Sequence, residues 1–291
     1  MDAIAVVAMR TLGATILLSL ILAVFQRSYF YIFPLGLAGC LLAGTLNGIG
    51  SLFFYAGLAR IDASLGQLLY TLYPVWVAIL LYFDGQQLSK ITLLRLALSI
   101  PGVFLITQAG TGFANWQGVI FMLIASLFYA LHIPINQRVL FEVPTPTVTL
   151  YTLFAMTAIV VPVWLLIPPH TLAIPIGSLW PVIGLTLATF LARLLLFAGV
   201  KTIGGVQTSI FGLAELLVTV ILAVGILGER LSFQQWIGAI ILTVTLLLAG
   251  FDQEPPPTRR RRGWLYWLRP PLPSSEEYPA YISQETDANP R

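Results

Sequence analysis

Three charged residues, Arg10, Arg193 and Glu215, lie well inside apolar stretches of this sequence, and the last two lie in consecutive stretches. Glu215 lies within FGLAELLVTVILAVG and Arg193 within ATFLARLLLFAG, so both have long apolar flanks. A carboxylate and a guanidinium can bind each other as an ion pair. They can also bind the ammonium and the carboxylate of one small zwitterion through charge-assisted hydrogen bonds. The sequence therefore predicts either a structural ion pair or a ligand site at these residues.

The two charges lie at similar depth in consecutive apolar segments. Arg193 comes eight residues before Lys201, about 12 Å along a helix, and Glu215 lies roughly 15 Å into the next helix. The five residues KTIGG join the two segments, which allows the charges to meet. Charged residues within a membrane usually face the interior of a bundle or a cavity. We therefore expect Glu215 and Arg193 to share one interior site.

The segments that carry these charges are long enough to cross a membrane. Hydrophobic residues make up 58% of the 291 residues and charged residues only 9%, whereas a soluble domain carries roughly 25% charged residues. Nine apolar runs have roughly the 20 residues needed to span a bilayer core about 30 Å thick. Such runs are too long for barrel strands, so we predict an all-α polytopic transmembrane helix bundle. The runs cover residues 4–25, 34–58, 64–83, 90–108, 116–138, 147–167, 179–200, 205–226 and 233–251.

The basic residues predict how this bundle is oriented. Counting the loops in alternation places five basic residues on one side (Arg27, Lys90, Arg95, Arg138 and Lys201) and two on the other (Arg60 and Arg230). The positive-inside rule then predicts a cytoplasmic C-terminus and an external N-terminus. We expect an integral protein of a plasma membrane, specifically a bacterial inner membrane.

The end of the chain is a polar tail. Residues 252–291 hold 12 of the 27 charged residues, including the arginine run 259–262. Trp264, Tyr266 and Trp267 suit an anchor in the membrane interface, and the arginines suit anionic lipid headgroups. A topology stop followed by disorder is an equal alternative.

Two stretches of the sequence match each other and indicate an internal repeat. FYAGLARIDASLGQLLYTLYPVWVAILLYFDGQQLS begins at Phe54, and LFAGVKTIGGVQTSIFGLAELLVTVILAVGILGERLS begins at Leu196. The copies lie five spans apart, and an odd separation gives them opposite orientations in the membrane. Inverted repeats of this kind are typical of membrane proteins whose site lies between two halves near the midplane.

The repeated residues also resemble a known family. The second copy carries Glu215 followed by Leu216, then Gly-Glu-Arg-Leu-Ser at 228–232, and the first copy carries Tyr73 and Pro74. These motifs resemble the two EamA-like repeats of the drug/metabolite transporter superfamily, whose pattern is Glu-Pro followed by Gly-Glu-Arg-Leu-Ser. The second copy keeps the glutamate and the first copy keeps the proline.

This resemblance implies how the chain is divided and what it does. It implies a first repeat at 1–108, a second at 116–251 and a tail at 252–291, with ten spans in the family where this sequence shows nine. We therefore expect the first repeat to lack its first span. The implied function is secondary transport of small metabolites by alternating access, in the direction of efflux. The family motifs do not specify the substrate; the charges of Glu215 and Arg193 suggest an amino-acid-like solute, and a drug-like solute is the alternative.

Two candidate site residues belong to the first repeat. Tyr73 occupies the repeat position of Glu215, beside Pro74, which removes a backbone hydrogen bond and can kink the helix. Asn47 either binds a substrate or bonds across helices, because it adjoins a stripe of small residues expected to pack helices closely. The stripe consists of Gly36, Cys40, Gly44 and Gly48.

Three more polar residues complete the predicted site. We place Tyr129 and His132 near the cytoplasmic end of a span, where His132 is either a proton relay or a hydrogen-bonded structural residue. Trp76 is expected to line the pocket. The candidate substrate-binding residues are thus Glu215, Arg193, Tyr73, Asn47, Trp76, Tyr129 and His132.

Two other classes of protein are alternatives: a membrane-embedded enzyme, such as a lipid-modifying transferase, and a non-transporting receptor or assembly protein. The two histidines, His132 and His170, lie in separate segments, and Cys40 is the one cysteine. We therefore expect no catalytic residues, no metal site and no cofactor. The sequence has no phosphate-binding G-x-x-x-x-G-K-[ST] loop, so ATP-driven transport is not predicted.

The expected partners are a small-molecule substrate and membrane lipids. A proton is the candidate coupling ion, although a nearby Arg193 would keep Glu215 ionised and disfavour a simple proton switch. A net charge of only +3 gives no reason to expect a nucleic-acid partner. No motif sets an oligomeric state.

Overall fold

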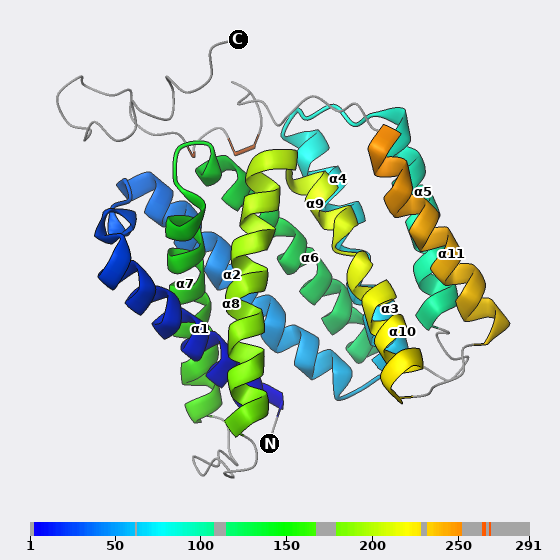
Figure 1. Ribbon diagram of the computed structural model, residues 1–291, viewed down its shortest axis with the longest axis horizontal. Helices are drawn as coiled ribbons and strands as arrows, with labels where there is room; N and C mark the ends of the chain where they lie inside the picture. The colour runs from blue at the N-terminus through cyan, green and yellow to red at the C-terminus, as the bar shows by residue number, and fades with distance from the viewer. Residues whose placement is uncertain are drawn as a thin grey trace.

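The computed structural model of the chain is a bundle of helices (Figure 1). It describes residues 3–61, 63–107, 115–166, 179–227, 232–251, 264–265 and 268. All secondary structure within these residues is helical, which confirms the predicted all-α class. Some sequence predictions fall outside the described residues: those for His170, for the motif at 228–231, for the arginine run 259–262, and for Tyr266 and Trp267.

The chain crosses the bundle nine times within the described residues. The first four passes are α1 (Ala3–Phe25), α2 (Pro34–Leu58), α3 (Ala63–Tyr70) with α4 (Tyr73–Phe83), and α5 (Lys90–Thr107). The other five are α6 (Trp116–Leu140), α7 (Thr145–Leu166), α8 (Leu179–Ile203), α9 (Gly205–Phe211) with α10 (Ala214–Leu227), and α11 (Phe233–Leu247). Short 3-10 turns follow α1 and α11, at Arg27–Phe30 and Leu248–Phe251.

These passes agree closely with the predicted apolar runs. Six of the described segments are long and apolar enough to cross a membrane by length and composition alone. Figure 1 shows α1 beginning at one end of the bundle and α11 finishing at the opposite end, as an odd number of passes requires. We call the end where α4, α6 and α11 finish the tail end, because Trp264, Leu265 and Leu268 lie there.

The two halves of the chain pack into each other. The helix α2 packs along α6 and α7, α1 packs against α7 and α8, and α5 packs against α11. Each of these contacts joins the part of the chain before residue 108 to the part after residue 116. Side chains from both halves therefore meet in the interior of the bundle.

The predicted stripe of small residues lies where α2 approaches α7. A Cβ atom added to Gly44 would overlap the carbonyl oxygen of Thr152, and one added to Gly48 would lie 3.0 Å from Ile159 Cβ. Cys40 is fully buried. Small side chains let two backbones approach closely, so Gly44 and Gly48 pack α2 against α7 as predicted, whereas Gly36 faces the ring of Phe33.

We expect Gly44→Ala to destabilise the protein. The added methyl group forces α2 away from α7, and overpacking of this kind costs about 1–3 kcal/mol. Gly184→Ala in α8 is the matched control, because a Cβ there meets no other atom within 4 Å. Thermal unfolding of the detergent-purified protein, followed by tryptophan fluorescence, measures both variants. Equal midpoints for Gly44→Ala and Gly184→Ala would contradict the packing.

Candidate functional site

Two of the nine passes are interrupted near their middle. In the first half, α3 ends at Tyr70 and α4 begins at Tyr73; in the second half, α9 ends at Phe211 and α10 begins at Ala214. These are the places that the internal repeat makes equivalent. Half-helices that begin inside a membrane direct their N-terminal turns toward the interior and commonly frame binding sites.

Each interruption has a local cause. Pro74 lies in the first turn of α4 and has no backbone N–H to continue the helix from α3. The second junction contains no proline. There the N–H of Leu213 donates to Ile210 O at 3.0 Å, and the N–H of Leu216 donates to Leu213 O at 3.1 Å. These bonds reach back three residues where a regular α-helix reaches back four.

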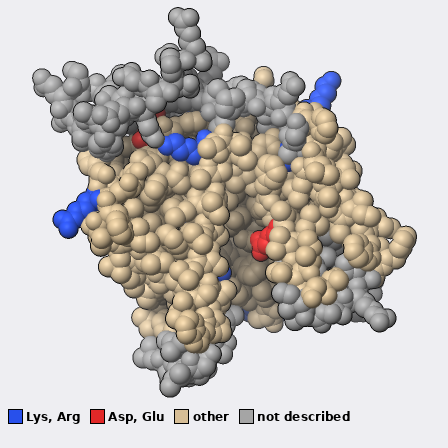
Figure 2. All heavy atoms as spheres, in the orientation of Figure 1, with Lys and Arg blue, Asp and Glu red and all other residues tan. Residues whose placement is uncertain are grey.

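Glu215 lies in the first turn of α10, directly after the second junction. Its side chain is exposed within the described bundle, and the positive end of the helix dipole favours a carboxylate at this position. Figure 2 shows a hollow in the middle of one face of the molecule, with acidic atoms on its wall. A carboxylate at this depth has access to a solute that enters the bundle.

Arg193 and Asn47 contact each other across the two halves. With the Asn47 amide oriented so that its oxygen faces α8, that oxygen lies 2.8 Å from both Nη1 and Nη2 of Arg193. The Sδ atom of Met156 lies 3.7 Å from Arg193 Nη2. Arg10 of α1 lies within electrostatic range of the same guanidinium, so two cations converge here. The predicted residues Arg193 and Asn47 are thus brought together.

Aromatic rings fill the space near these charges. The ring centroids of Tyr73 and Tyr129 lie 4.8 Å apart, and those of Tyr70 and Tyr129 lie 5.4 Å apart. Arg193 and Glu215 are both within electrostatic range of Tyr70 and Tyr129, so the rings have a cation and an anion as neighbours. We call Tyr70, Tyr73 and Tyr129 the tyrosine cluster.

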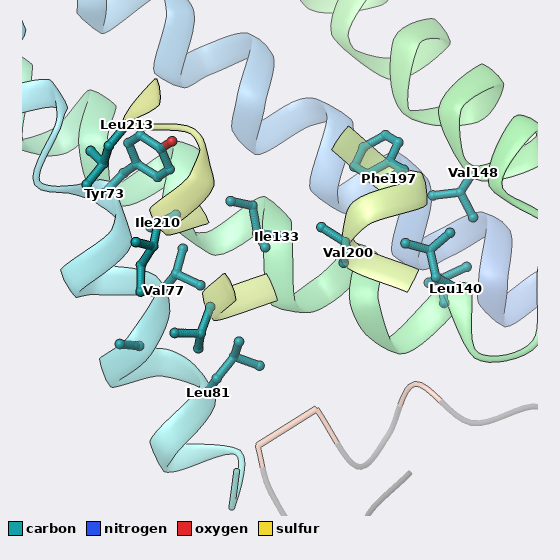
Figure 3. Close-up of a cluster of buried hydrophobic side chains, with 14 of the residues drawn as sticks. Tyr73, Val77, Leu81, Ile133, Leu140, Val148, Phe197, Val200, Ile210 and Leu213 are labelled. Atoms are coloured by element: carbon teal, nitrogen blue, oxygen red, sulfur yellow. The ribbon is translucent and has the colours of Figure 1, made fainter. Parts of the chain in front are cut away.

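Tyr73 is less available than the sequence suggests. Its side chain is 9% exposed, and its hydroxyl donates to the carbonyl oxygen of Ser209 in α9 at 3.0 Å. Figure 3 shows Tyr73 beside Leu213 and Ile210 of the second half. The hydroxyl therefore joins the two halves at the α9–α10 junction.

Tyr129 and His132 lie closer to the middle of their helix than expected. The prediction placed them near one end of a span, but α6 continues to Leu140. The His132 ring is fully buried, with its centroid 4.7 Å from that of Tyr129, and its Nδ1 contacts the Tyr129 carbonyl oxygen. The role of His132 as a proton relay stays a prediction.

Trp76 Nε1 and Arg10 Nε are buried donors without a hydrogen-bond partner in the described bundle, and His132 Nε2 is a buried ring nitrogen without one. Buried donors of this kind are rare unless a water, an ion or a ligand satisfies them. Trp76 is half-buried on α4, one turn beyond Tyr73.

The predicted ion pair between Glu215 and Arg193 stays a prediction. The contact that the structure gives the Arg193 guanidinium is with Asn47, in the other half of the chain. An ion pair that the described residues do form joins Arg138 Nη2 to Asp84 Oδ2 at 2.8 Å, and it lies at the tail end. Burial raises the pKa of the Asp84 carboxyl, while the Leu265 N–H and Arg138 act in the opposite direction.

The sequence analysis missed one buried cation near the second junction. Arg95 of α5 is fully buried, donates from Nε to Thr245 O at 3.0 Å, and bonds through Nη1 to the Gln207 side chain. Its guanidinium lies 5.6 Å from the centroid of the Phe211 ring. The position of Arg95 within an apolar run was a usable signal, but the residue lies just inside the helix that follows Lys90, so the sequence analysis counted it only among the basic residues that set the orientation.

Comparison with known proteins adds independent support. A search of curated proteins finds no significant match. A solved structure titled "Crystal structure of protein" matches with a TM-score of 0.61 and 16% sequence identity, over 83% of this chain and 95% of that chain. At this identity the likeness concerns the fold alone. The model of the EamA-like transporter family matches residues 1–108 and 116–251. The chain is therefore a member of the EamA-like transporter family, and it is an integral membrane protein with the all-helical fold that its apolar segments predict.

Proposed function

We propose that this protein is a secondary transporter that exports small amino-acid-like metabolites by alternating access. The family is one of membrane transporters, and the finer assignment rests on the site. The observation that carries it is the convergence of Glu215, Arg193 and the tyrosine cluster at mid-depth, with contributions from both halves. A site shared by two inverted halves can be exposed to either side of a membrane in turn.

The charges define the chemistry that a substrate needs. In this proposal Glu215 binds an ammonium group and Arg193 binds a carboxylate. The Arg193 guanidinium has five N–H donors, so a substrate carboxylate can bind it while Asn47 also does. The tyrosine rings offer an apolar and weakly polar surface for the rest of the molecule.

The alternative functions need a different set of side chains. An enzyme needs a nucleophile, an acid–base pair or metal ligands that converge. Within the described residues no group of three or more His, Cys, Asp or Glu side chains is placed to hold a metal ion. A receptor or an assembly protein would leave the mid-depth charges purely structural.

Transport in proteoliposomes separates these functions. Proteoliposomes that contain the purified protein are each loaded with one solute from a panel of zwitterions, anions and cations. Counterflow is then measured as uptake of the same solute in labelled form. The proposal expects counterflow of at least one zwitterion that exceeds that of the anions and cations. Turnover of a lipid without any solute movement would support an enzyme, and inactivity with every solute of the panel would contradict transport of this substrate class.

The proposed orientation has the tail end in the cytoplasm, and surface labelling tests it. In a Cys40→Ser background, Lys201→Cys places a thiol at the tail end and Arg60→Cys places one at the opposite end; both native side chains are exposed. We expect an impermeant maleimide added to whole cells to label the Arg60→Cys protein alone. Labelling of the Lys201→Cys protein alone would reverse the orientation.

A further inference from the structure

At the α9–α10 junction one backbone carbonyl oxygen loses its helical hydrogen-bond donor, and a side chain from the other half of the chain donates to it instead. In a continuous helix the N–H of Leu213 would donate to Ser209 O. Here it donates to Ile210 O, and the Tyr73 hydroxyl donates to Ser209 O at 3.0 Å. A released carbonyl inside a membrane must find another donor. Tyr73 supplies this donor from α4.

Gly212 provides the space for this bond. A Cβ atom added to Gly212 would overlap the Tyr73 hydroxyl, and the next atom of the same side chain, Tyr73 Cζ, would lie at 3.3 Å. The backbone of Gly212 has φ −57° and ψ −24°, which any residue adopts. The glycine is therefore required by the approach of the hydroxyl and not by the conformation of the chain.

The junction also sets the position of Glu215. The backbone N–H of Glu215 donates to Gly212 O at 3.1 Å, so the first turn of α10 starts from the residue against which the Tyr73 hydroxyl packs. A change at the Tyr73 contact is transmitted to Glu215 through one hydrogen bond.

We propose that Tyr73 is a positioning residue that holds the α9–α10 junction and thereby the carboxylate of Glu215. This inference rests on the proposed function in so far as Glu215 binds the substrate. The bond joins the two halves that move against each other during alternating access. The strength of the hydrogen bond from Tyr73 to Ser209 therefore affects how readily the two halves separate. It also affects the position of Glu215.

Three variants test the contact by its geometry. We expect Gly212→Ala to lower transport about 10-fold or more, because the added methyl group overlaps the Tyr73 hydroxyl and displaces it. Tyr73→Phe removes the bond and leaves the ring, so the loss is smaller. In the Tyr73→Phe background the hydroxyl is gone, so adding Gly212→Ala should cause little further loss. Gly225→Ala in α10 is the matched control, since its Cβ meets no other atom within 4 Å.

A measurement that needs no transport separates this inference from the proposed function. Hydrogen–deuterium exchange of the peptide that spans residues 209–215 should be faster in Tyr73→Phe than in the native protein, and unchanged in Gly225→Ala. An unchanged exchange rate in Tyr73→Phe would overturn the inference. So would a loss of transport on Gly212→Ala that is as large in the Tyr73→Phe protein as in the native protein. Faster exchange in a protein that moves no solute would uphold the positioning role and refute transport.

A separate observation concerns the chain after the last helix. Leu265 and Leu268 are buried, at 0% and 7% exposure, and they pack with Ala43 of α2 and Ile135 of α6. The N–H of Leu265 donates to Asp84 Oδ1 at 3.1 Å. The other carboxylate oxygen of Asp84 binds Arg138 at the end of α6.

This segment reaches across both halves at the tail end. The Trp264 indole N–H donates to Leu80 O in the last turn of α4 at 3.0 Å. A Cβ atom added to Gly39 of α2 would lie 3.0 Å from Leu268 Cδ2, so α2 has a recess where this leucine lies. The contacts with α4 belong to the first half, and those with α6 belong to the second.

We infer that Trp264, Leu265 and Leu268 act as a strap that restrains the tail end from opening during the proposed transport. Replacing both buried leucines, as Leu265→Ser with Leu268→Ser, should speed hydrogen exchange at residues 80–84 and raise the maximal transport rate. Leu272→Ser, the same substitution elsewhere in the tail, is the comparator. Unchanged exchange at residues 80–84 would refute the docking, and faster exchange with an unchanged or lower transport rate would refute the restraint.

Discussion

Glu215→Gln is expected to lower transport by about 10-fold to 100-fold while the protein remains folded. The substitution keeps the shape of the side chain and removes its charge, so an ammonium group loses a charge-assisted hydrogen bond worth about 1.5–3 kcal/mol. The carboxylate is exposed in the first turn of α10, where the helix dipole favours a negative charge. Removing the charge should therefore affect the substrate more than the fold.

The control for this prediction makes the same substitution outside the site. Glu142 lies just after α6, at the tail end of the bundle, and Glu142→Gln should leave transport within about 2-fold of the native rate, as surface changes away from a site usually do. Initial rates in proteoliposomes and thermal midpoints in detergent are measured for both variants. A Glu215→Gln protein with native transport would remove this carboxylate from the site.

Arg193→Lys is expected to lower transport by at least about 10-fold although the positive charge is kept. A guanidinium can bind the Asn47 oxygen through two nitrogens and still bind a carboxylate, whereas an ammonium is a point charge without this planar fork. The charge alone therefore does not restore the geometry. Lys201→Arg is the reciprocal control on α8, because Lys201 is exposed at the end of the same helix. Native transport in the Arg193→Lys variant would show that only the charge matters.

The double variant decides between the two interpretations of these charges. If Glu215 and Arg193 form only a structural pair, combining Glu215→Gln with Arg193→Gln removes both charges together and should restore folding and transport. If they bind the two ends of a substrate, the double variant should fold and stay inactive. Our account expects the second result, since Arg193 has Asn47 as a contact that does not involve Glu215.

The sequence predicts the architecture well because membrane spans are set by local composition. The length of each apolar run follows from the thickness of the bilayer, and the described helices agree with these runs. The packing role of Gly44 was likewise visible in the spacing of the small residues. The break before Tyr73 was anticipated from Pro74, because proline acts within its own helix.

The details that the sequence did not reveal all depend on contacts between distant segments. The second break has no proline and is held by Tyr73, 136 residues earlier in the chain. The contact of Arg193 with Asn47 joins α8 to α2, and no spacing rule connects these helices. Tyr70 was missed for the same reason, since its neighbour Tyr129 comes from another helix.

The central claim is that a zwitterionic solute binds between the halves and is carried across the membrane. Counterflow of labelled solutes into proteoliposomes tests it most directly when native protein is compared with Glu215→Gln. The account predicts that the native protein exchanges at least one zwitterion and that Glu215→Gln reduces this exchange toward the level of empty liposomes. Equal exchange by the two proteins, or exchange by neither, would contradict it.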